Sequence, residues 1–355
     1  MMKLLDKIVL FVSSIAMLGL LGAYTASYVN PNTFVWPSLL GLAYPYLLIA
    51  NIILLLYWIT RWKKAAFAVL IVILLGIPSF MTYYGTASDN EQEKDSDISL
   101  LSYNIRYFDV YKWSNQEDTK EKLFNYLNHF KGDVICLQEF STNDNSSFQK
   151  TIIYNLKSFP YYHIYKDMAI FSQIPFIRKG NIFFDPQYSS SCIYCDIPLC
   201  GDTVRIYSVH LESYKLGKKE RQFMKDISQG VKSNNIPEKV KNLTKRLTTA
   251  NKNRALQAEQ IKRHLQKSPY QVVLCGDFND TPLSYTYKKL KGELEDSFIE
   301  KGRGLGNTYI GEFPSFRIDY ILHTPNLETV SYSRNHIQLS DHYPITSKLR
   351  MKNRK

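Results

Sequence analysis

Residues 8–60 contain no Asp, Glu, Lys or Arg, whereas a soluble domain of this length keeps charged side chains on its surface. No other feature limits the possible folds as strongly. About 20 apolar residues cross a bilayer as a helix, and proline-containing breaks divide the stretch into segments 8–29 and 38–60. A third uncharged segment covers residues 65–84. The sequence predicts three transmembrane helices within residues 1–84.

The first segment has an alternative interpretation as a signal peptide that is removed. Lys3 and Lys7 precede its apolar run, and small residues follow near Ala26. Removal of that segment would still leave two spans. We favour three spans, because aromatic residues typical of membrane–water interfaces flank the segments: Trp36, Trp58, Trp62, Tyr83 and Tyr84.

The positions of the cations predict the orientation, because Lys and Arg in short loops stay in the cytoplasm. Two lysines precede the first segment, and the basic stretch 61–64 joins the second and third. The first loop is uncharged, and an acidic linker, residues 85–97, follows the third segment. This pattern places the rest of the chain outside the cytoplasm, which in a bacterium is the periplasmic side of the inner membrane.

Residues 98–355 have a different sequence pattern, in which short β-rich runs alternate irregularly with amphipathic stretches. Strands are predicted at 98–103, 134–137, 169–171, 193–197, 204–209, 272–274, 318–322 and 345–349, and helices at 118–129, within 211–229 and at 250–265. Some strands are joined by hairpin-length loops such as Cys200-Gly201-Asp202. Hairpins join antiparallel strands and longer crossovers join parallel ones, so mixed sheets are expected.

Polar side chains collect where these apolar runs end. Asn104 follows the first run, Glu139 the second and His210 a third. The motif CGDFND adds Asp277 and Asn279 after a fourth. Each alone is ordinary turn chemistry, because Asp and Asn hydrogen-bond their own backbone in tight bends. Their recurrence at successive strand ends favours a shared site.

Further candidates lie near the end of the chain. Asp319 is part of the apolar run RIDYIL, where an ionised carboxylate is costly to bury without a partner. It needs a cation, a metal ion or a histidine. The motif SDHYPI supplies Asp341 and His342 shortly before the last predicted strand, so His342 is a candidate partner.

This ordered set resembles the motifs of the endonuclease/exonuclease/phosphatase superfamily, which includes pancreatic deoxyribonuclease, abasic-site endonucleases, inositol polyphosphate phosphatases and neutral sphingomyelinases. The order Asn, Glu, His, Gly-Asp-x-Asn, Asp, Ser-Asp-His matches over about residues 98–350. The resemblance implies a four-layered α/β sandwich, with two mixed β-sheets packed face to face and helices outside. It also implies hydrolysis of phosphodiester bonds in a cleft at one edge.

The resemblance implies a metal site and a proton-transfer group. Glu139, with Asn104 and Asp341, would bind a divalent cation, and hard oxygen ligands suit Mg²⁺ or Mn²⁺. His342, oriented by Asp319, would take the proton of the attacking water or hold the phosphate.

Three more residues complete the implied site. Asp277 would position the nucleophile, Asn279 would hydrogen-bond a phosphoryl oxygen or the metal shell, and His210 would donate to the phosphate or leaving group. The general base is either Asp277 or His342. Abasic-site enzymes of the family usually carry an acid where this chain has Arg106, which weakens the case for DNA repair.

The segment 213–255 is strongly basic, with twelve Lys and Arg and three acids in a chain of net charge +12. It is either a solvated helical insertion or a rim that attracts a polyanion or anionic lipid headgroups. Arg254, one helical turn from Gln257, is predicted to face the substrate. Few aromatic residues interleave with the cations, so a base-stacking groove is not indicated.

The five cysteines are relevant to the cellular compartment, because disulfides form outside the cytoplasm. Cys136 and Cys275 fall in predicted core strands, whereas Cys192, Cys195 and Cys200 cluster near a hairpin. One disulfide among these three is compatible with an extracytoplasmic domain. A Cys192–Cys195 pair is geometrically awkward, because residues three apart on a strand point to opposite faces.

Three functions are compatible with these features. The leading one is a membrane-anchored, metal-dependent phosphodiesterase or nuclease, and the second is a phospholipid or inositol-phosphate hydrolase that acts near its own bilayer. The third is a catalytically silent membrane scaffold. The complete set of acids and both histidines argues against the third function. No protein partner can be inferred.

Overall fold

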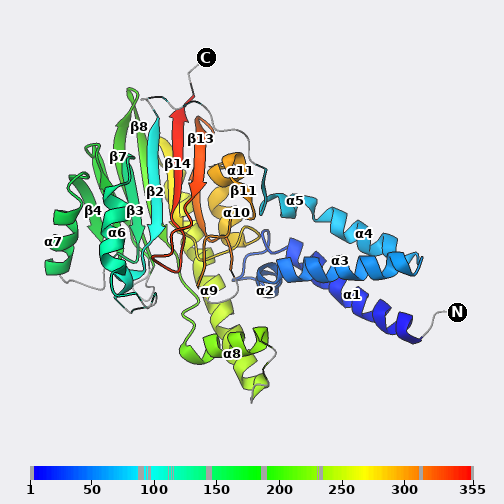
Figure 1. The fold of residues 1–355 in the computed structure, drawn as a ribbon. Coiled ribbons are helices and arrows are strands. Elements are labelled where there is room, and N and C mark those ends of the chain that lie inside the picture. The colour runs from blue at the N-terminus through cyan, green and yellow to red at the C-terminus, as the bar shows by residue number, and fades with distance from the viewer. Residues whose placement is uncertain are drawn as a thin grey trace.

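The computed structural model describes residues 4–86, 97–110, 116–140, 146–184, 190–229, 235–311 and 315–352, with residues 92, 94, 112, 114 and 231. Most of the expected linker, including its acids Asp89, Glu91, Glu93 and Asp95, lies outside these residues. Figure 1 shows a bundle of N-terminal helices that projects from a larger α/β body.

Two six-stranded sheets form the body. The first has the order β10-β12-β9-β8-β7-β6, and the second β13-β14-β2-β3-β5-β4. Each contains one parallel pair, β8 with β9 and β2 with β3, among antiparallel neighbours. Both sheets are therefore mixed, as predicted.

All eight predicted strands are present, together with edge strands that the apolar pattern did not reveal. The first sheet contains β6 Arg178–Ile182, β7 Ser191–Leu199, β8 Asp202–His210, β9 Gln271–Asp277, β10 Glu295–Asp296 and β12 Asp319–His323. The second contains β2 Ile98–Asn104, β3 Val134–Gln138, β4 Tyr161–Tyr165, β5 Met168–Ser172, β13 Leu327–Arg334 and β14 Ile345–Met351.

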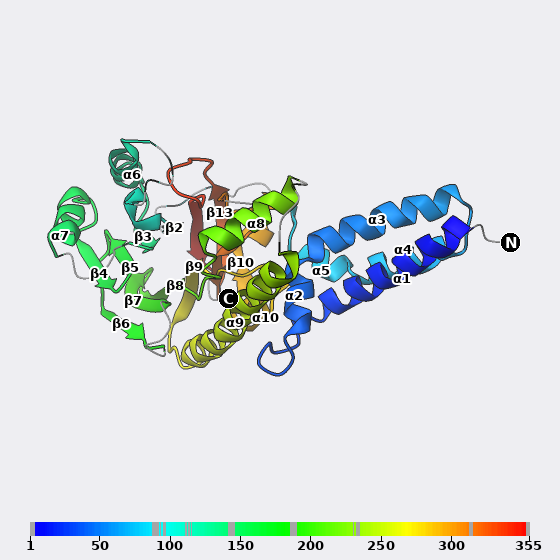
Figure 2. The ribbon, with the colours of Figure 1, turned by 90° about the horizontal axis from the view of Figure 1, so that it is seen from below.

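Helices cover the outer face of each sheet, so the body has four layers (Figure 2). Val273 and Cys275 of β9 belong to the cluster between the sheets, whereas Leu274 packs with Ile261 on the outer face. Both faces of the central strands are buried, which explains their continuous apolar runs. The covering helices are α6 Thr119–Asn128 and α7 Ser146–Asn155 on the second sheet, and α9 Ile236–Leu265 and α10 Tyr285–Lys291 on the first.

The positions of the cysteines follow the alternation of side chains between the two faces of each strand. Cys192 lies in the outer cluster and Cys195 in the cluster between the sheets, on opposite faces of β7. No disulfide joins any of the five cysteines, all of which lie in the described residues. The hairpin from β7 to β8 turns at Cys200 and Gly201, which have φ angles of 52° and 79°.

The N-terminal helices differ from the three continuous spans expected. The region contains α1 Leu4–Tyr24, α2 Trp36–Leu42, α3 Tyr44–Thr60, α4 Ala65–Leu75 and α5 Ile77–Met81. Among the described residues α1 alone is long and apolar enough to cross a membrane; α2 and α3, bent by 69°, add a second candidate if counted together. The three-span prediction is not supported, because prolines at the starts of α2, α3 and α5 divide the apolar stretch.

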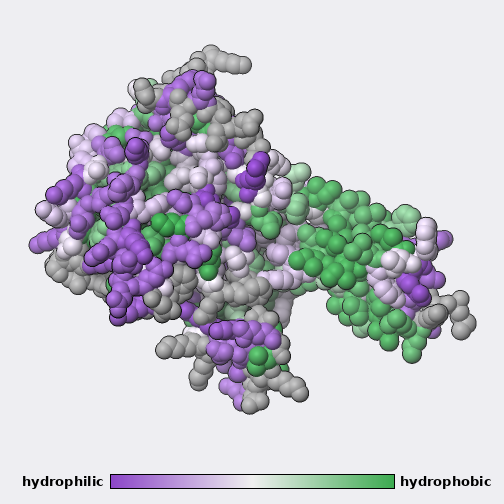
Figure 3. Space-filling model, viewed as in Figure 1, coloured by the Kyte–Doolittle hydropathy of each residue, from purple (hydrophilic) through white to green (hydrophobic). Residues whose placement is uncertain are grey.

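The outer surface of this bundle is nonetheless apolar (Figure 3). Phe11, Ile53 and Phe67 are 68%, 61% and 70% exposed, respectively. Contiguous exposed apolar surface of this kind marks a site that contacts a membrane or another protein.

The bundle is fixed to the body by polar contacts. Asn30 Nδ2 donates to Glu259 Oε1 at 2.9 Å, and Asn251 Nδ2 donates to Ser38 Oγ at 2.8 Å. The buried Arg317 donates to the carbonyl of Thr82 at 2.8 Å. Nearby, β1 Gly85–Thr86 pairs with β11 Arg303–Gly304, which follows α11 Ser297–Lys301. The helices and the body therefore form one connected structure.

Gly276→Ala tests the close packing of β8 and β9. Gly276 has a φ of +131°, and an added Cβ would lie 2.0 Å from the carbonyl oxygen of Val209. We expect the free energy of unfolding to fall by roughly 3 kcal/mol or more, measured by thermal denaturation of the detergent-solubilised chain.

Gly201→Ala is the matched control, because Gly201 has a φ of +79° but no atom within 4 Å of its added Cβ. It should cost only about 1–2 kcal/mol. Equal losses in the two variants would contradict the packing argument.

Candidate functional site

The register of the first sheet brings three of the predicted residues together. His210 is the partner of Asp277 in the parallel pair β8–β9, and Asp277 is the partner of Asp319 in the antiparallel pair β9–β12. Partner residues on adjacent strands have their Cα atoms about 5 Å apart. The three side chains therefore belong to one edge of the sheet.

The second sheet contributes the rest at the same edge. Asn104 ends β2, and Glu139 directly follows β3, which runs parallel to β2. Strand β14 runs antiparallel to β2, so Asp341 and His342, just before β14, lie at this edge too. Ser340 Oγ donates to the carbonyl of Asn104 at 2.8 Å, which ties the final motif to β2.

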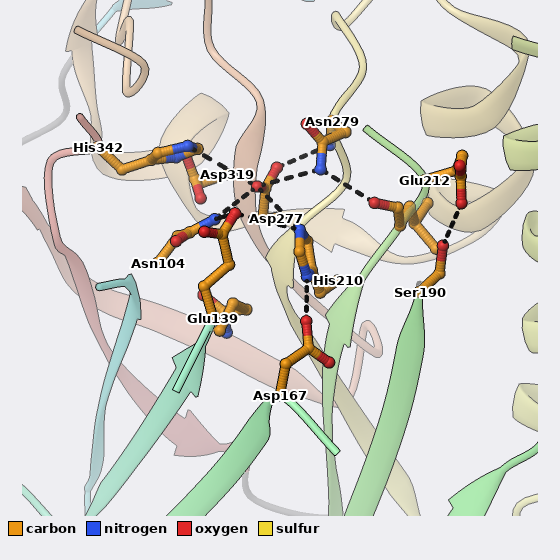
Figure 4. Close-up of polar contacts among 12 residues, drawn as sticks. Asn104, Glu139, Asp167, Ser190, His210, Glu212, Asp277, Asn279, Asp319 and His342 are labelled. Atoms are coloured by element: carbon orange, nitrogen blue, oxygen red, sulfur yellow. Dashed lines mark hydrogen bonds and ion pairs between the residues drawn. The ribbon is translucent and has the colours of Figure 1, made fainter. Parts of the chain in front are cut away.

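Two histidine–aspartate pairs flank Asp277 (Figure 4). His342 Nδ1 and Asp319 Oδ2 are 2.9 Å apart, and His342 Nε2 lies 3.8 Å from Asp277 Oδ2. On the other side His210 Nδ1 is 2.9 Å from Asp167 Oδ2, and His210 Nε2 lies 3.9 Å from Asp277 Oδ2. Each carboxylate orients one imidazole, and both Nε2 atoms point toward Asp277.

Asp277 is held by donors from the second sheet and from the turn that follows β9. Asn104 Nδ2 donates to its Oδ2 at 3.0 Å, and the backbone N–H of Asn279 donates to its Oδ1 at 2.7 Å. Asn104 Nδ2 also lies 3.2 Å from Glu139 Oε1. His210 Nε2, 3.7 Å from Glu139 Oε1, is buried without a hydrogen-bond partner in the described structure, so it remains available to a ligand.

The backbone around the site is strained at several residues. Arg106, Tyr107, Glu139 and Asn279 have φ angles of 44°, 55°, 49° and 52°. Left-handed backbone is uncommon for residues other than glycine and costs of order 1–3 kcal/mol where it is poorly tolerated. The N–H of Tyr107 donates to the carbonyl of Glu139 at 2.7 Å, which helps to hold the Glu139 carboxylate toward the cavity.

The buried charges shift one another's pKa values. Burial opposes protonation of His342, but Asp319 and Asp277 outweigh it and raise the His342 pKa to about 10. For His210 burial is again outweighed, mainly by Asp167, and its pKa rises to about 9. Burial and the neighbouring Asp319 raise the pKa of Asp277 to about 6. Without a bound metal, both imidazoles are protonated at neutral pH.

These side chains open into a cavity of about 380 Å³. Its charged end is lined by Arg106, Glu139, Asp277, Asp341 and His342. Arg106 Nη1 pairs with Asp341 Oδ2 at 2.7 Å, so the cavity offers a cation beside its acids. The short helix η1 Arg106–Asp109 supplies this arginine.

The donor set suits a hard divalent cation. Ligand atoms of Asp277, Asp319 and His342 lie within 4.8 Å of one another, and oxygen predominates among the surrounding acids. The predicted ligands Asn104, Glu139 and Asp341 lie at the same edge, but Asp341 is engaged by Arg106. The carboxylate and amide oxygens at this edge therefore fit a divalent cation.

Arg254 does not face the cavity. Its guanidinium is fully buried, donates to Asp280 Oδ2 at 3.1 Å and to the Glu212 carbonyl at 2.8 Å, and stacks on Tyr214. The neighbouring Gln257 donates to Ser190 Oγ at 2.9 Å. Both residues lie on the face of α9 that packs against the body, and Arg254 thus supports Tyr214, which lines the cavity.

Sequence reasoning missed Asp167. It lies in the turn between β4 and β5. Because β5 runs antiparallel to β3, the start of β5 is at the same edge as the end of β3. The signal available in the sequence was an acid immediately before the apolar run that begins at Met168.

Sequence comparison covers most of the chain. A profile described as Endonuclease/Exonuclease/phosphatase family matches residues 101–342, and one described as a domain of unknown function matches residues 6–83. No curated protein matches the sequence.

Several solved structures share the fold of the body. A humanized D. rerio TDP2 has a TM-score of 0.53 at 17% identity, covering 72% of this chain and 100% of that chain. D. rerio TDP2 complexed with single-strand DNA product gives 0.52 at 16% identity, covering 72% and 100%. The human Nocturnin catalytic domain with bound sulfate gives 0.52 at 14% identity, covering 73% and 96%. At these identities the likeness concerns the fold alone.

Asp319→Asn tests the coupling between His342 and its carboxylate. Loss of the negative charge should lower the His342 pKa from about 10 toward its ordinary 6.5. Because the folded-state pKa is raised, this coupling stabilises the metal-free fold fully below about pH 6.5 and is lost as the pH approaches 10. Histidine-labelled protein, titrated by NMR without metal, measures the change.

His210 is the internal control for this titration, because its nearest carboxylate is Asp167 and not Asp319. Its pKa should stay near 9. A His342 pKa that does not move in the variant would contradict the assigned pair.

Proposed function

The chain belongs to the endonuclease/exonuclease/phosphatase family, and we propose that it is a membrane-anchored, divalent-metal-dependent phosphoesterase that hydrolyses phosphodiester bonds. One observation carries this proposal: two oriented imidazoles, His210 and His342, converge on a buried carboxylate, Asp277, which lines a cavity together with further acids. Hydrolysis of a phosphate ester needs groups that neutralise phosphate oxygens and a group that accepts the proton of water.

The two imidazoles are suited to hold the phosphate. Each has its Nδ1 engaged by an aspartate, so each directs Nε2 to the region in front of Asp277. Protonated imidazoles at these positions would donate to phosphoryl oxygens and stabilise the charge that develops there. The ring of Tyr309 packs edge-on against His342, with 5.3 Å between centroids, which restricts that imidazole further.

Asp277 is the better candidate for the general base. With a pKa of about 6 its carboxylate is ionised at neutral pH, whereas His342, with a pKa of about 10, already carries its proton. Asn104 and Asn279 fix the orientation of the Asp277 carboxylate through hydrogen bonds of 3.0 and 2.7 Å. Asp277 would thus orient the attacking water and accept its proton.

A magnesium or manganese ion would be held by Glu139, with Asn104 and Asp341 beside it. Its contribution would be positive charge next to the phosphate and the leaving oxygen. Arg106, paired with Asp341 at 2.7 Å, supplies a second positive charge at the same end of the cavity and would help to bind the ester.

The substrate classes compatible with this chemistry are nucleic acid and the phosphorylated headgroups of lipids or inositol. D. rerio TDP2, whose fold resembles this one, has been solved with single-strand DNA product, which supports the first class. The apolar helical bundle supports the second, because it would hold the body next to a bilayer.

The N-terminal bundle is proposed to anchor the chain, with the body outside the cytoplasm, as at the periplasmic face of a bacterial inner membrane. The exposed apolar surface of α1, α3 and α4 supports the anchor, and the basic stretch 61–64 supports the orientation. A periplasm-active reporter such as alkaline phosphatase, fused after Lys355, should be active. Activity of a cytoplasmic reporter at the same position would overturn the orientation.

Glu139→Ala and His342→Ala test the site directly. With Mg²⁺ or Mn²⁺, the wild-type chain should cleave bis(p-nitrophenyl) phosphate, and chelation should abolish cleavage. Each variant should lose about 10²-fold or more in kcat/KM, because each removes a group that stabilises transition-state charge. Release of p-nitrophenol measures the rate.

Glu121→Ala and His129→Ala are the matched controls, since both residues are exposed, on or just after α6 on the outer face of the second sheet. They should retain wild-type activity. Wild-type turnover in Glu139→Ala and His342→Ala would refute the site assignment.

A further inference from the structure

The cavity lining has two chemically different parts. The strand ends and the loops beside them supply the acids, Arg106 and His342, whereas an apolar wall comes mainly from α2, α8 and α9. That wall is formed by Leu42, Leu216, Met224, Leu243, Leu247 and Phe316. A ligand that fills the whole cavity must therefore combine an anionic group with an apolar one.

The apolar wall is not part of a packed core. All six side chains are half-buried, and none belongs to the four hydrophobic clusters found in the described residues. Leu243 and Leu247 lie four residues apart on α9, so they share one face of that helix. A ligand that covers this apolar surface removes it from water, which favours binding.

The wall is built partly by the membrane-anchor region itself. Leu42 is the last residue of α2, and Asn32 Nδ2 donates to the carbonyl of Lys252 on α9 at 3.0 Å. The insertion that holds α8 Lys218–Ser228 and the first half of α9 supplies Met224, Leu243 and Leu247. Figures 1 and 2 show α2, at the base of the bundle, beside α9.

The aliphatic wall discriminates between the substrate classes. Leu42, Leu216, Met224, Leu243 and Leu247 offer no hydrogen bond to a phosphate or to the edge of a base. Two cations also line the cavity, and each has a partner within the chain: Lys215 Nζ pairs with Glu212 at 2.7 Å, and Arg221 Nε donates to the Leu216 carbonyl at 2.9 Å. A polyanionic strand would gain little from this wall, whereas a hydrocarbon chain would cover it.

We propose that the cavity binds an amphiphilic phosphate ester from the bilayer, with its phosphate at the charged end and its hydrocarbon chain along the apolar wall. The inference rests on the proposed phosphoesterase function, because that function places the phosphate beside Asp277 and His342. Bundle and insertion then act together as a subsite for the chain of a lipid.

Binding of methylphosphonate and hexylphosphonate tests this assignment without relying on turnover. Calorimetry is performed on the full chain in lipid nanodiscs with Mg²⁺, and the signal of empty nanodiscs is subtracted. Burial of the additional methylene groups against the wall favours binding, so hexylphosphonate should bind about tenfold or more tightly than methylphosphonate. Equal affinities for the two probes would overturn the proposal.

Leu243→Gln locates the subsite, with Leu256→Gln as its matched control. Both leucines lie on α9, but Leu256 is 42% exposed and does not line the cavity. The advantage of hexylphosphonate should fall about fivefold in Leu243→Gln and persist in Leu256→Gln. An undiminished advantage in a folded Leu243→Gln, and likewise in Leu247→Gln, would overturn the proposal.

Cleavage of bis(p-nitrophenyl) phosphate by the same wild-type preparation separates this inference from the proposed function. Cleavage without any chain-length advantage would refute the lipid subsite alone. A chain-length advantage without cleavage would support the subsite and count against the phosphoesterase function.

Discussion

Asp277 is the group on which both sheets converge. An ionised carboxylate this deeply buried is costly unless donors compensate it, and the donors come from Asn104 on the second sheet and Asn279 on the following turn. The two imidazoles add positive charge from either side. The close approach of β8 and β9 at Gly276 fixes the register that makes His210 its neighbour. The whole site is therefore a consequence of how these few strands pair.

The N-terminal helices extend the candidate site beyond the α/β body. Their outer surface is apolar, yet their inner end is bound to α9, α10 and the segment before β12 by specific contacts, among them Arg317 with Thr82. A flexible tether needs no such contacts. The same region contributes Leu42 to the cavity, so the bundle and the candidate site belong to one connected structure.

The sequence predicted the central strands and the set of strand-end residues, because both depend on local patterns. Eight apolar runs became strands, and Asn104, Glu139, His210, Asp277, Asp319 and His342 lie together at one edge. Other features depend on tertiary packing. Asp167 belongs to the site only because β5 runs antiparallel to β3.

Two further expectations were wrong, because they depended on tertiary packing and on helix boundaries that the local sequence pattern does not show. The spacing of Arg254 and Gln257 placed them on one face of α9, but that face packs inward, where Asp280 and Ser190 bind them. The apolar composition of residues 8–84 predicted three spans, but it did not show where prolines would end each helix. The composition therefore predicted an apolar outer surface, which the bundle has, but not where each helix begins and ends.

The most direct test of the central claim is the position of a bound divalent cation. Crystals of the full chain soaked in Mn²⁺ should give an anomalous scattering peak within bonding distance of a Glu139 oxygen, at the edge shared by Asn104, Asp277 and Asp341. A second group, Glu295, Glu300 and His323, also has its ligand atoms within 4.8 Å of one another. A peak at that group, with none beside Glu139, would contradict the account.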